Sequence, residues 1–189
     1  EKLLVLEFLN AIDDADENNL VVIISKYTSE NFNMKCTHPF NELEGADKIA
    51  KYLWSPIKKS FKPIQRRMDI FYAGTNLVDN HSSKWVVNMG HLLGSFNNPF
   101  LGIEPTKKTV MLWYCEFYRV ENNKITEGAF FLDILKFMQH LKLSVVPDST
   151  GMVGFNPGPK THDGLYFKKQ RDEEGNKTLN LMMRMANRL

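Results

Sequence analysis

The stretch TVMLWYCEFYRVENNKITEGAFFLD, residues 109–133, has the pattern of two β-strands joined by a tight turn. Both halves are rich in aromatic and β-branched side chains, which favour strands. Asn122 and Asn123 lie between the halves, and asparagine tolerates the positive φ angles of a short hairpin turn. The stretch therefore predicts an antiparallel β-hairpin that ends at Asp133.

The register of this hairpin decides which side chains share a face. If Glu121 pairs with Lys124, strict alternation of side chains divides the hairpin into two faces. One face carries polar groups among apolar neighbours: Tyr114, Glu116, Tyr118, Glu127 and Asp133. The other face is almost wholly apolar: Trp113, Cys115, Phe117, Phe130 and Leu132. Because both faces look covered and one holds carboxylates, the hairpin indicates a cavity with ionisable groups in its wall.

The rest of the first 143 residues supplies helices and further strands. Apolar residues at helical spacing predict amphipathic helices over 5–12, 20–27, from about 47, and over 134–141. Pro56 should interrupt the third helix, because proline lacks a backbone donor. Strands are expected over about 32–40, 66–73 and 84–96. Helices gathered early and hairpin-connected strands later are typical of an α+β fold, so we expect a curved antiparallel sheet wrapped on the N-terminal helices with a pocket between them.

The character of the sequence changes after Leu143. Prolines and glycines punctuate the next segment, and a Met-rich apolar stretch closes it. We therefore expect one domain over residues 1–143 and an arm or linker over 144–189 that ends in an apolar helix, from about Thr178. Such a helix needs a partner surface. The sequence leaves open whether the helix docks on this domain, crosses to a second copy or begins a second, similar domain.

The overall composition is that of a soluble globular protein, with 43% hydrophobic and 24% charged residues. A net charge of +2 gives no sign of nucleic-acid binding. No run approaches the roughly 18 apolar residues that span a bilayer, so no membrane partner is expected. We interpret the basic cluster of residues 58–67 as a solvated face: Lys58, Lys59, Lys62, Arg66 and Arg67.

The two cysteines, Cys36 and Cys115, have neither metal-binding nor redox spacing. Both lie in strand-like runs and are interpreted as buried thiols of a reducing compartment. There is also no signal-peptide pattern, so we expect a cytoplasmic protein.

Five segments in consistent order resemble the SnoaL-like polyketide cyclase family, within the nuclear transport factor 2 superfamily. They are THPFNELEGADKI (37–49), NMGHLLG (88–94), NPFLGIEPTKKTV (98–110), EFYRVENNKITE (116–127) and the closing Asp133. The resemblance covers about residues 1–143, and Lys107 stands where the family usually has glycine. The later segment NPGPKTHDG (156–164) resembles relatives in which a second similar domain follows.

The resemblance implies a cone-shaped α+β barrel with an apolar cavity, often dimeric through its sheet. Family members of known activity close a polyketide ring by intramolecular aldol chemistry, without metal or cofactor. In them an aspartate at the end of the last strand takes the substrate proton, and a histidine on a neighbouring strand assists. Asp133 matches the place of the aspartate, and His91 is the histidine in a matching motif.

Asp133 and His91 are therefore the candidate catalytic residues. Each has a plainer interpretation: Asp133 precedes a predicted helix that it could cap, and His91 could be an ordinary strand histidine. Candidate ligand-binding residues are polar or aromatic side chains of the strands and the third helix: Glu116, Tyr114, Tyr72, Trp54, Phe71, Met89, Trp113 and Phe131.

Glu116 lies in mid-strand between aromatics, where a glutamate is costly unless it is paired. It is expected to face a polar cavity or to bond Arg119 or Tyr118. No pair of histidines has metal-ligand spacing with a carboxylate on one face, so we expect no metal. No cofactor is expected either.

Three functions fit these patterns. The first is a cofactor-free lyase or isomerase acting on a small, mostly apolar, carbonyl-containing molecule. The second is a module that binds such a molecule without chemistry. The third is an interaction protein that forms a homodimer through the apolar face of its hairpin.

Overall fold

The computed structural model describes residues 1–143, 145–147, 150–151, 158–169 and 171–188. Its helical elements are α1 (Lys2–Asp14), the 3₁₀ turn η1 (Glu17–Asn19), α2 (Leu20–Tyr27), α3 (Gly45–Ile49), the π-helical turn η2 (Ala50–Trp54), α4 (Ser55–Ser60), α5 (Ile134–His140) and α6 (Asp172–Ala186). Its strands are β1 (Thr28–Cys36), β2 (Glu42–Glu44), β3 (Phe61–Thr75), β4 (Lys84–Phe96), β5 (Thr109–Glu121) and β6 (Lys124–Leu132).

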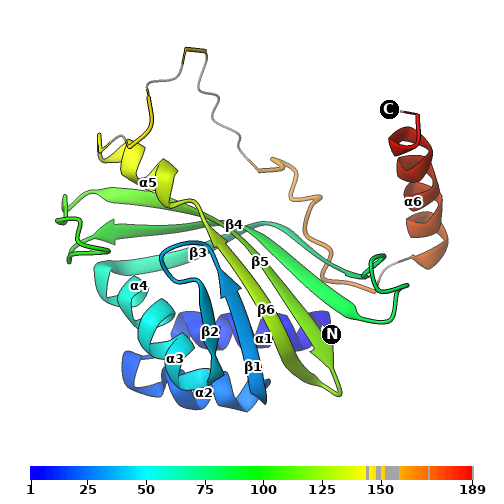
Figure 1. The fold of residues 1–189 in the computed structure, drawn as a ribbon, viewed down its shortest axis with the longest axis horizontal. Helices are drawn as coiled ribbons and strands as arrows, with labels where there is room; N and C mark the ends of the chain where they lie inside the picture. The colour runs from blue at the N-terminus through cyan, green and yellow to red at the C-terminus, as the bar shows by residue number, and fades with distance from the viewer. Residues whose placement is uncertain (144, 148–149, 152–157, 170, 189) are drawn as a thin grey trace.

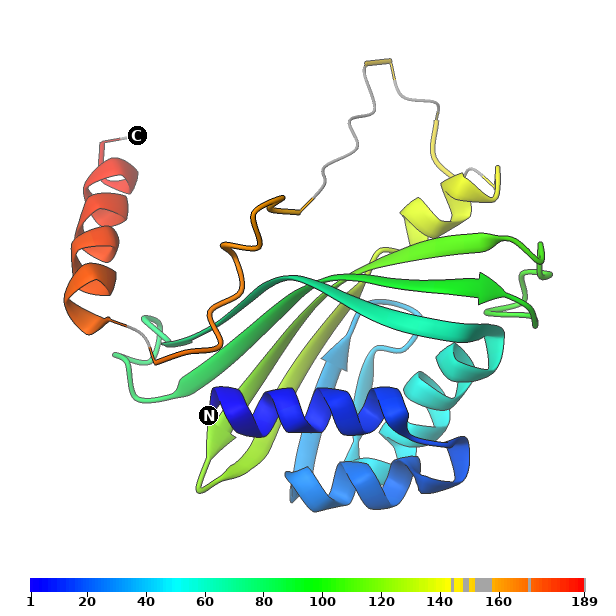
Figure 2. The same cartoon turned by 180° about the vertical axis from the view of Figure 1, so that it is seen from behind.

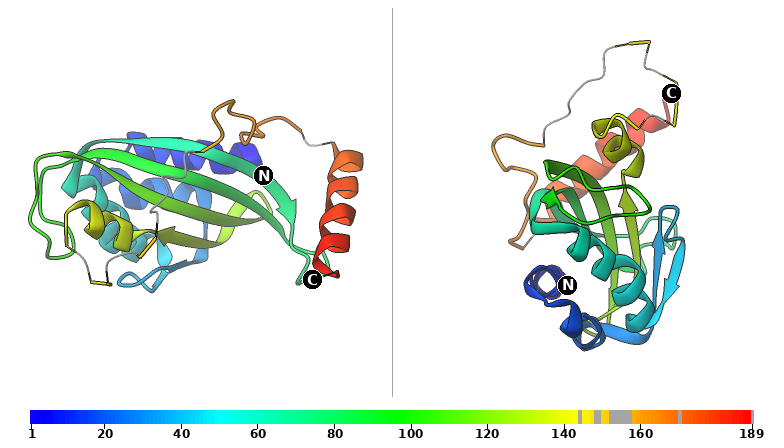
Figure 3. Two further views of the ribbon diagram at one scale, coloured as in Figure 1. Left: turned by 90° about the horizontal axis from the view of Figure 1, so that it is seen from above. Right: turned by 90° about the vertical axis from the view of Figure 1, so that its left-hand side faces the viewer.

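The strands form one sheet in the order β2-β1-β6-β5-β4-β3. Helices α1–α4 cover one face of this sheet, which curves over them (Figures 1 and 3). We call the face toward these helices the inner face and the opposite face the outer face. The predicted α+β fold is confirmed. Two details differ from the expectation: β1 runs parallel to β6, so the sheet is mixed, and β2 and β3 are free edges, so it does not close into a barrel.

The apolar stripe predicted for the first helix is the surface that packs on the sheet. Val5, Phe8, Leu9 and Ile12 are the buried residues of α1. The Phe8 ring meets Tyr118 of β5 edge-on, with ring centroids 5.6 Å apart. Helices α1 and α2 lie side by side in this layer (Figure 2). Helical periodicity therefore identified the core face of this layer correctly.

The third predicted helix is interrupted, as expected. It is divided into α3, the π-helical turn η2 and α4, and Pro56 lies in the first turn of α4. Proline is tolerated there because the first N–H groups of a helix have no intrahelical partner. The π-helical turn ends at Trp54, which is buried. Single π turns often occur at functional sites.

The central hairpin is confirmed, but its predicted register is wrong beyond the turn. Glu121 pairs with Lys124 and Val120 with Ile125, whereas Arg119 pairs with Glu127. One extra residue, Thr126, therefore forms a β-bulge in β6. Because side chains alternate along a strand, one extra residue exchanges the two faces of everything that follows it.

The bulge corrects the predicted division of the hairpin into two faces. On β5, Tyr114, Glu116 and Tyr118 do share the inner face, and their side chains are buried. On β6, the inner face carries Phe130 and Leu132, which are buried. The predicted inner residue Glu127 instead lies on the outer face.

The segment 158–169 follows the free edge of β3. The Phe71 amide donates to the Gly164 carbonyl at 2.8 Å, and the Tyr166 amide donates to the Phe71 carbonyl at 2.7 Å. The rings of Phe71 and Phe167 lie 5.3 Å apart. The apolar helix expected from about Thr178 is present as α6, which has no buried residue. Whether residues 144–189 are an arm or part of another domain stays a prediction.

The glycines of the NMGHLLG motif lie where β3 passes closest to β4. A Cβ atom on Gly90 would lie 2.0 Å from the Arg67 carbonyl oxygen, and one on Gly94 would lie 3.0 Å from that of Pro63. Gly90 faces Met68 beside the irregularity that Asp69 introduces into β3. Only a residue without a side chain permits this approach of two backbones.

We therefore predict that Gly90→Ala destabilises the protein by about 1–3 kcal/mol, because the new methyl group must push the β3 backbone away. Gly74→Ala is the matched control, since nothing lies within 4 Å of a Cβ atom there. Urea unfolding of both variants measures the difference. Equal unfolding free energies would contradict the close approach.

Candidate functional site

A cluster of buried polar side chains lies on the inner face, centred on Arg66 of β3. Its Nη1 atom lies 3.0 Å from each carboxylate oxygen of Glu116 on β5. Its Nε atom donates to the carboxylate of Asp13 on α1, at 2.9 Å and 3.2 Å. The side chains of Arg66 and Glu116 are 2% and 0% exposed. The site is therefore built around a fully desolvated ion pair.

Two further side chains complete the hydrogen bonding of Glu116. Asn88 of β4 faces Glu116 directly in the sheet, and its Nδ2 donates to Glu116 Oε2 at 2.9 Å. The Tyr114 hydroxyl in turn donates to Asn88 Oδ1 at 3.3 Å. Both oxygens of the carboxylate are thus engaged.

Two aromatic rings pack against the Arg66 guanidinium. Its Cζ atom lies 5.4 Å from the ring centroid of Trp54 and 5.0 Å from that of Tyr114. A guanidinium over an aromatic face is attracted by the ring quadrupole, most strongly where water is excluded. The side chain is consequently fixed by two carboxylates and two rings.

Burial shifts the pKa values of the ionisable groups in this cluster. Burial raises the pKa of the Glu116 carboxyl, against the opposing effects of Arg66 and Asn88. Burial lowers the pKa of Arg66, but the carboxylates of Glu116 and Asp13 outweigh it and leave that pKa above its ordinary value. Burial also raises the pKa of Tyr114, so this hydroxyl stays protonated and able to donate.

A small cavity adjoins this cluster. It has a volume of about 10 Å³ and is lined by Asp13, Trp54, Ile57, Lys58, Ile64, Arg66 and Leu92. A space of this size holds about one water-sized group. This cavity is far smaller than the hollow interior that the sequence predicted, and Arg66 is among the side chains that line it.

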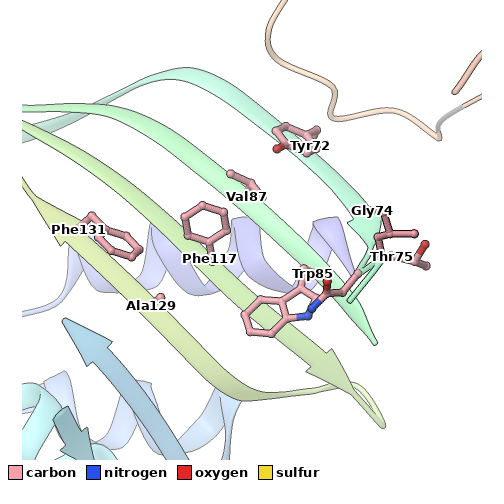
Figure 4. Close-up of a pocket in the computed structure, with 10 residues that line it drawn as sticks. Tyr72, Gly74, Thr75, Trp85, Val87, Phe117, Ala129 and Phe131 are labelled. Carbon is pink, nitrogen blue, oxygen red and sulfur yellow. The ribbon is translucent and has the colours of Figure 1, made fainter. Parts of the chain in front are cut away.

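Two larger hollows lie on the outer face. The first has a volume of about 550 Å³, and Tyr72, Trp85, Val87, Phe117 and Phe131 are among its lining residues (Figure 4). The second has a volume of about 320 Å³ and is lined by Thr37, Met89, Trp113, Tyr114, Cys115, Phe131, Leu132 and Asp133. Because Phe131 lines both, the two hollows adjoin.

The sheet separates the predicted site residues into two groups. Four lie on the inner side: Glu116, Tyr114, Trp54 and Phe71. Five have outer-face positions: His91, Tyr72, Met89, Trp113 and Phe131. Asp133 follows β6 and lines the smaller outer hollow. The sequence analysis had placed Glu116 and Asp133 on one face, and the bulge in β6 explains the difference.

Asp133 is the N-cap of α5. One of its carboxylate oxygens accepts a hydrogen bond from the Lys136 amide at 2.8 Å, and its own amide donates to the Trp113 carbonyl at 2.9 Å. The residue is exposed. The predicted capping role is present, and a catalytic role remains a prediction.

His91 lies beside Trp113 on the outer face. Their ring centroids are 5.0 Å apart, and the two residues face each other across β4 and β5. The His91 Nδ1 atom lies 3.7 Å from an Asp69 carboxylate oxygen. Within the described part of the chain, this nitrogen has no hydrogen-bond partner. Trp113 therefore lies between the two candidate catalytic residues and contacts both.

Sequence reasoning missed Arg66, Asn88 and Asp13. The basic cluster was interpreted as a solvated face, which is wrong for Arg66 because its side chain is buried. The predicted partner Arg119 lies near Glu121 and Glu127 instead. Alternation along β3 was the available signal, since Arg66 faces Leu92, a core residue of β4.

Cys36 and Cys115 are free and partly buried, and burial raises the pKa of the Cys36 thiol to about 12. In the residues that the structure describes, no group of three or more His, Cys, Asp or Glu side chains is placed to hold a metal ion. No helix within those residues has both the length and the apolar character needed to cross a bilayer.

Solved structures with the same arrangement of helices and strands include SnoaL-like proteins. A candidate SnoaL-like polyketide cyclase from Jannaschia sp. CCS1 superposes with a TM-score of 0.55 at 16% identity, over 77% of this chain and 95% of that one. An NTF2-like protein from Burkholderia thailandensis E264 gives 0.55 at 15% identity, over 74% and 95%. This chain has the SnoaL-like fold.

A further structural neighbour is described by a different activity. AclR from Streptomyces galilaeus, a candidate hydroxylase, superposes with a TM-score of 0.60 at 21% identity, over 78% of this chain and 86% of that one. No protein-family model matches the sequence, and no curated protein matches it significantly. At these identities the SnoaL-like likeness establishes the fold alone.

The unfolding free energy of the protein should depend on the buried pair of Arg66 and Glu116. Arg66→Met should cost about 3–5 kcal/mol of unfolding free energy, because it leaves the Glu116 carboxylate buried without its cation. The double variant Arg66→Met/Glu116→Leu should recover most of that loss, since both charges are gone. Denaturant unfolding of the single and double variants measures the coupling. Additive losses would mean that the two side chains do not stabilise each other.

Proposed function

We propose that this protein binds a small, mostly apolar, carbonyl-containing molecule on the outer face of its sheet and acts on it as a cofactor-free lyase or isomerase. The proposal rests on one observation: the apolar hollow of about 550 Å³ adjoins the smaller hollow that contains Asp133. Ligand sites of small molecules usually occupy about 300–1,000 Å³, which favours this face over the inner cavity of about 10 Å³.

The lining of the larger hollow fits a flat, apolar molecule. Phe117 and Phe131 meet edge-to-face with centroids 6.0 Å apart, and Tyr72 and Trp85 line the same hollow. Figure 4 shows Tyr72, Phe117 and Phe131 projecting from three strands on the same face. Offset and edge contacts of this kind would hold an aromatic or conjugated ring.

Asp133 supplies the base in this proposal. It is the carboxylate among the residues that line the smaller hollow. Its capping bond to the Lys136 amide involves Oδ1, which leaves Oδ2 to take a proton from the carbon next to the ligand carbonyl. His91, on the far side of Trp113, would then donate a hydrogen bond to the resulting enolate oxygen. A positioned general base typically contributes about 10²–10⁴-fold.

Exchange of the carbon-bound protons of 2-tetralone in deuterium oxide, followed by NMR, tests this function. The native protein should accelerate exchange, and Asp133→Asn should remove about 10²–10⁴-fold of that acceleration. Asparagine is as good an N-cap as aspartate, so this variant keeps α5 intact. Asp14→Asn, an exposed aspartate of α1, is the matched control.

An exchange rate that Asp133→Asn leaves unchanged would refute the catalytic role. If saturation-transfer NMR still detected bound 2-tetralone, the protein would be a binding module without this chemistry.

A second candidate function, homodimer formation, is favoured by exposed apolar side chains on the same face. Tyr72, Met89 and Phe131 are 40%, 41% and 50% exposed. Contiguous apolar surface of this kind usually marks an interaction site. A second copy placed face to face would cover both hollows and exclude water from them.

Sedimentation velocity at micromolar concentration tests this association. We predict a dimer for the native chain and a monomer for Met89→Lys, because the new charge would be buried in the interface. Leu3→Lys is the control, since Leu3 is 67% exposed on α1, on the opposite side of the sheet. A native chain that sediments as a monomer would exclude the dimer.

A further inference from the structure

We propose that the small inner cavity is a separate recognition site for one neutral oxygen acceptor, such as the carbonyl oxygen of a ketone, held by Arg66 Nη2 and Trp54 Nε1. Both residues line the cavity. Both atoms are buried, and neither donates a hydrogen bond of normal geometry to the described residues. This site is distinct from the outer-face site, because the sheet lies between them.

The Arg66 side chain has one unused donor group. Its Nε atom is bound by Asp13 and its Nη1 atom by Glu116, while the rings of Trp54 and Tyr114 pack against the guanidinium. The guanidinium therefore cannot turn to satisfy Nη2 without breaking one of these contacts. A buried donor without an acceptor is unfavourable, so an incoming oxygen would be stabilised there.

Trp54 offers the second donor from the opposite layer. It ends the π-helical turn η2, and its side chain is held against Phe130 with ring centroids 5.5 Å apart. The indole N–H can only donate. Two fixed donors from two elements, one on the sheet and one on the helices, are a preorganised arrangement for a single acceptor.

The size of the cavity limits what can enter. A volume of about 10 Å³ admits an oxygen but not the body of a ligand. The rest of the molecule would lie toward Asp13 and Lys58, which also line the cavity, and the Asp13 side chain is 33% exposed. The site thus suits a carbonyl oxygen at the end of a slender group.

The surrounding charges favour a neutral ligand over an anion. The positive charge of Arg66 is already matched by Glu116 at 3.0 Å and Asp13 at 2.9 Å. A carboxylate placed on Nη2 would meet two negative groups for one cation and would lose its own hydration. A ketone oxygen carries no net charge and accepts hydrogen bonds equally well.

Acetone and acetate are matched probes for this site because they have nearly the same shape and differ in charge. The indole N–H signal of Trp54 in a ¹⁵N correlation spectrum, assigned by its absence in Trp54→Phe, is the readout. Acetone should move this signal saturably, whereas acetate at the same ionic strength should not. The signals of Trp85 and Trp113 serve as internal controls.

Variants separate the roles of the two donors. Arg66→Lys should weaken the acetone response at least about tenfold, since lysine cannot keep both carboxylates and offer a further donor. If Arg66→Lys does not fold, saturation-transfer NMR can instead compare acetone binding by Trp54→Phe and by the native protein. The variant should bind acetone more weakly. Asp133→Asn should leave the Trp54 response unchanged, so failure of the outer-face function does not affect this test.

Two results would overturn the proposal. A Trp54 signal that acetone does not move would mean that the cavity holds only water. A response to acetate equal to that to acetone would mean that the site does not select neutral acceptors.

Discussion

The buried pair of Arg66 and Glu116 is the constraint on which the inner side of this fold depends. Two charges removed from water must be compensated almost completely, or the domain unfolds. The compensation comes from α1 through Asp13, from β4 through Asn88 and from η2 through Trp54. Each of these elements is thereby held in one position relative to the sheet. Asp13, Trp54 and Arg66 also line the small inner cavity, so the compensated charges form part of its wall.

Much of this architecture could be predicted from the sequence because it depends on local periodicity. The core stripe of α1, the division of the third helix just before Pro56 and the hairpin turn at Asn122 and Asn123 are all confirmed. The direction of β1 was not accessible in this way. Its partner is β6, about ninety residues away in the chain, and no short connection fixes whether the two run parallel.

The candidate site was harder to predict, for two physical reasons. One extra residue at Thr126 leaves the composition of β6 unchanged, yet it exchanges the faces of Glu127 and Phe131. Charge alone also suggested that Arg66 lies in water, whereas alternation along β3 points it at the core. At Arg66, composition and alternation disagreed, and alternation was correct. The cap at Asp133 was foreseen because it requires only the neighbouring residues.

Residues 158–169 pair with part of the outer edge of β3, which limits the addition of a strand from another molecule there. A long free strand can add a strand from another molecule and continue into a fibre. Here Gly164 and Tyr166 occupy the backbone groups of Phe71 in the middle of β3. The opposite border, β2, is three residues long and carries two glutamates. Both margins of the sheet therefore carry features that disfavour the addition of a further strand, and with it growth into an edge-to-edge fibre.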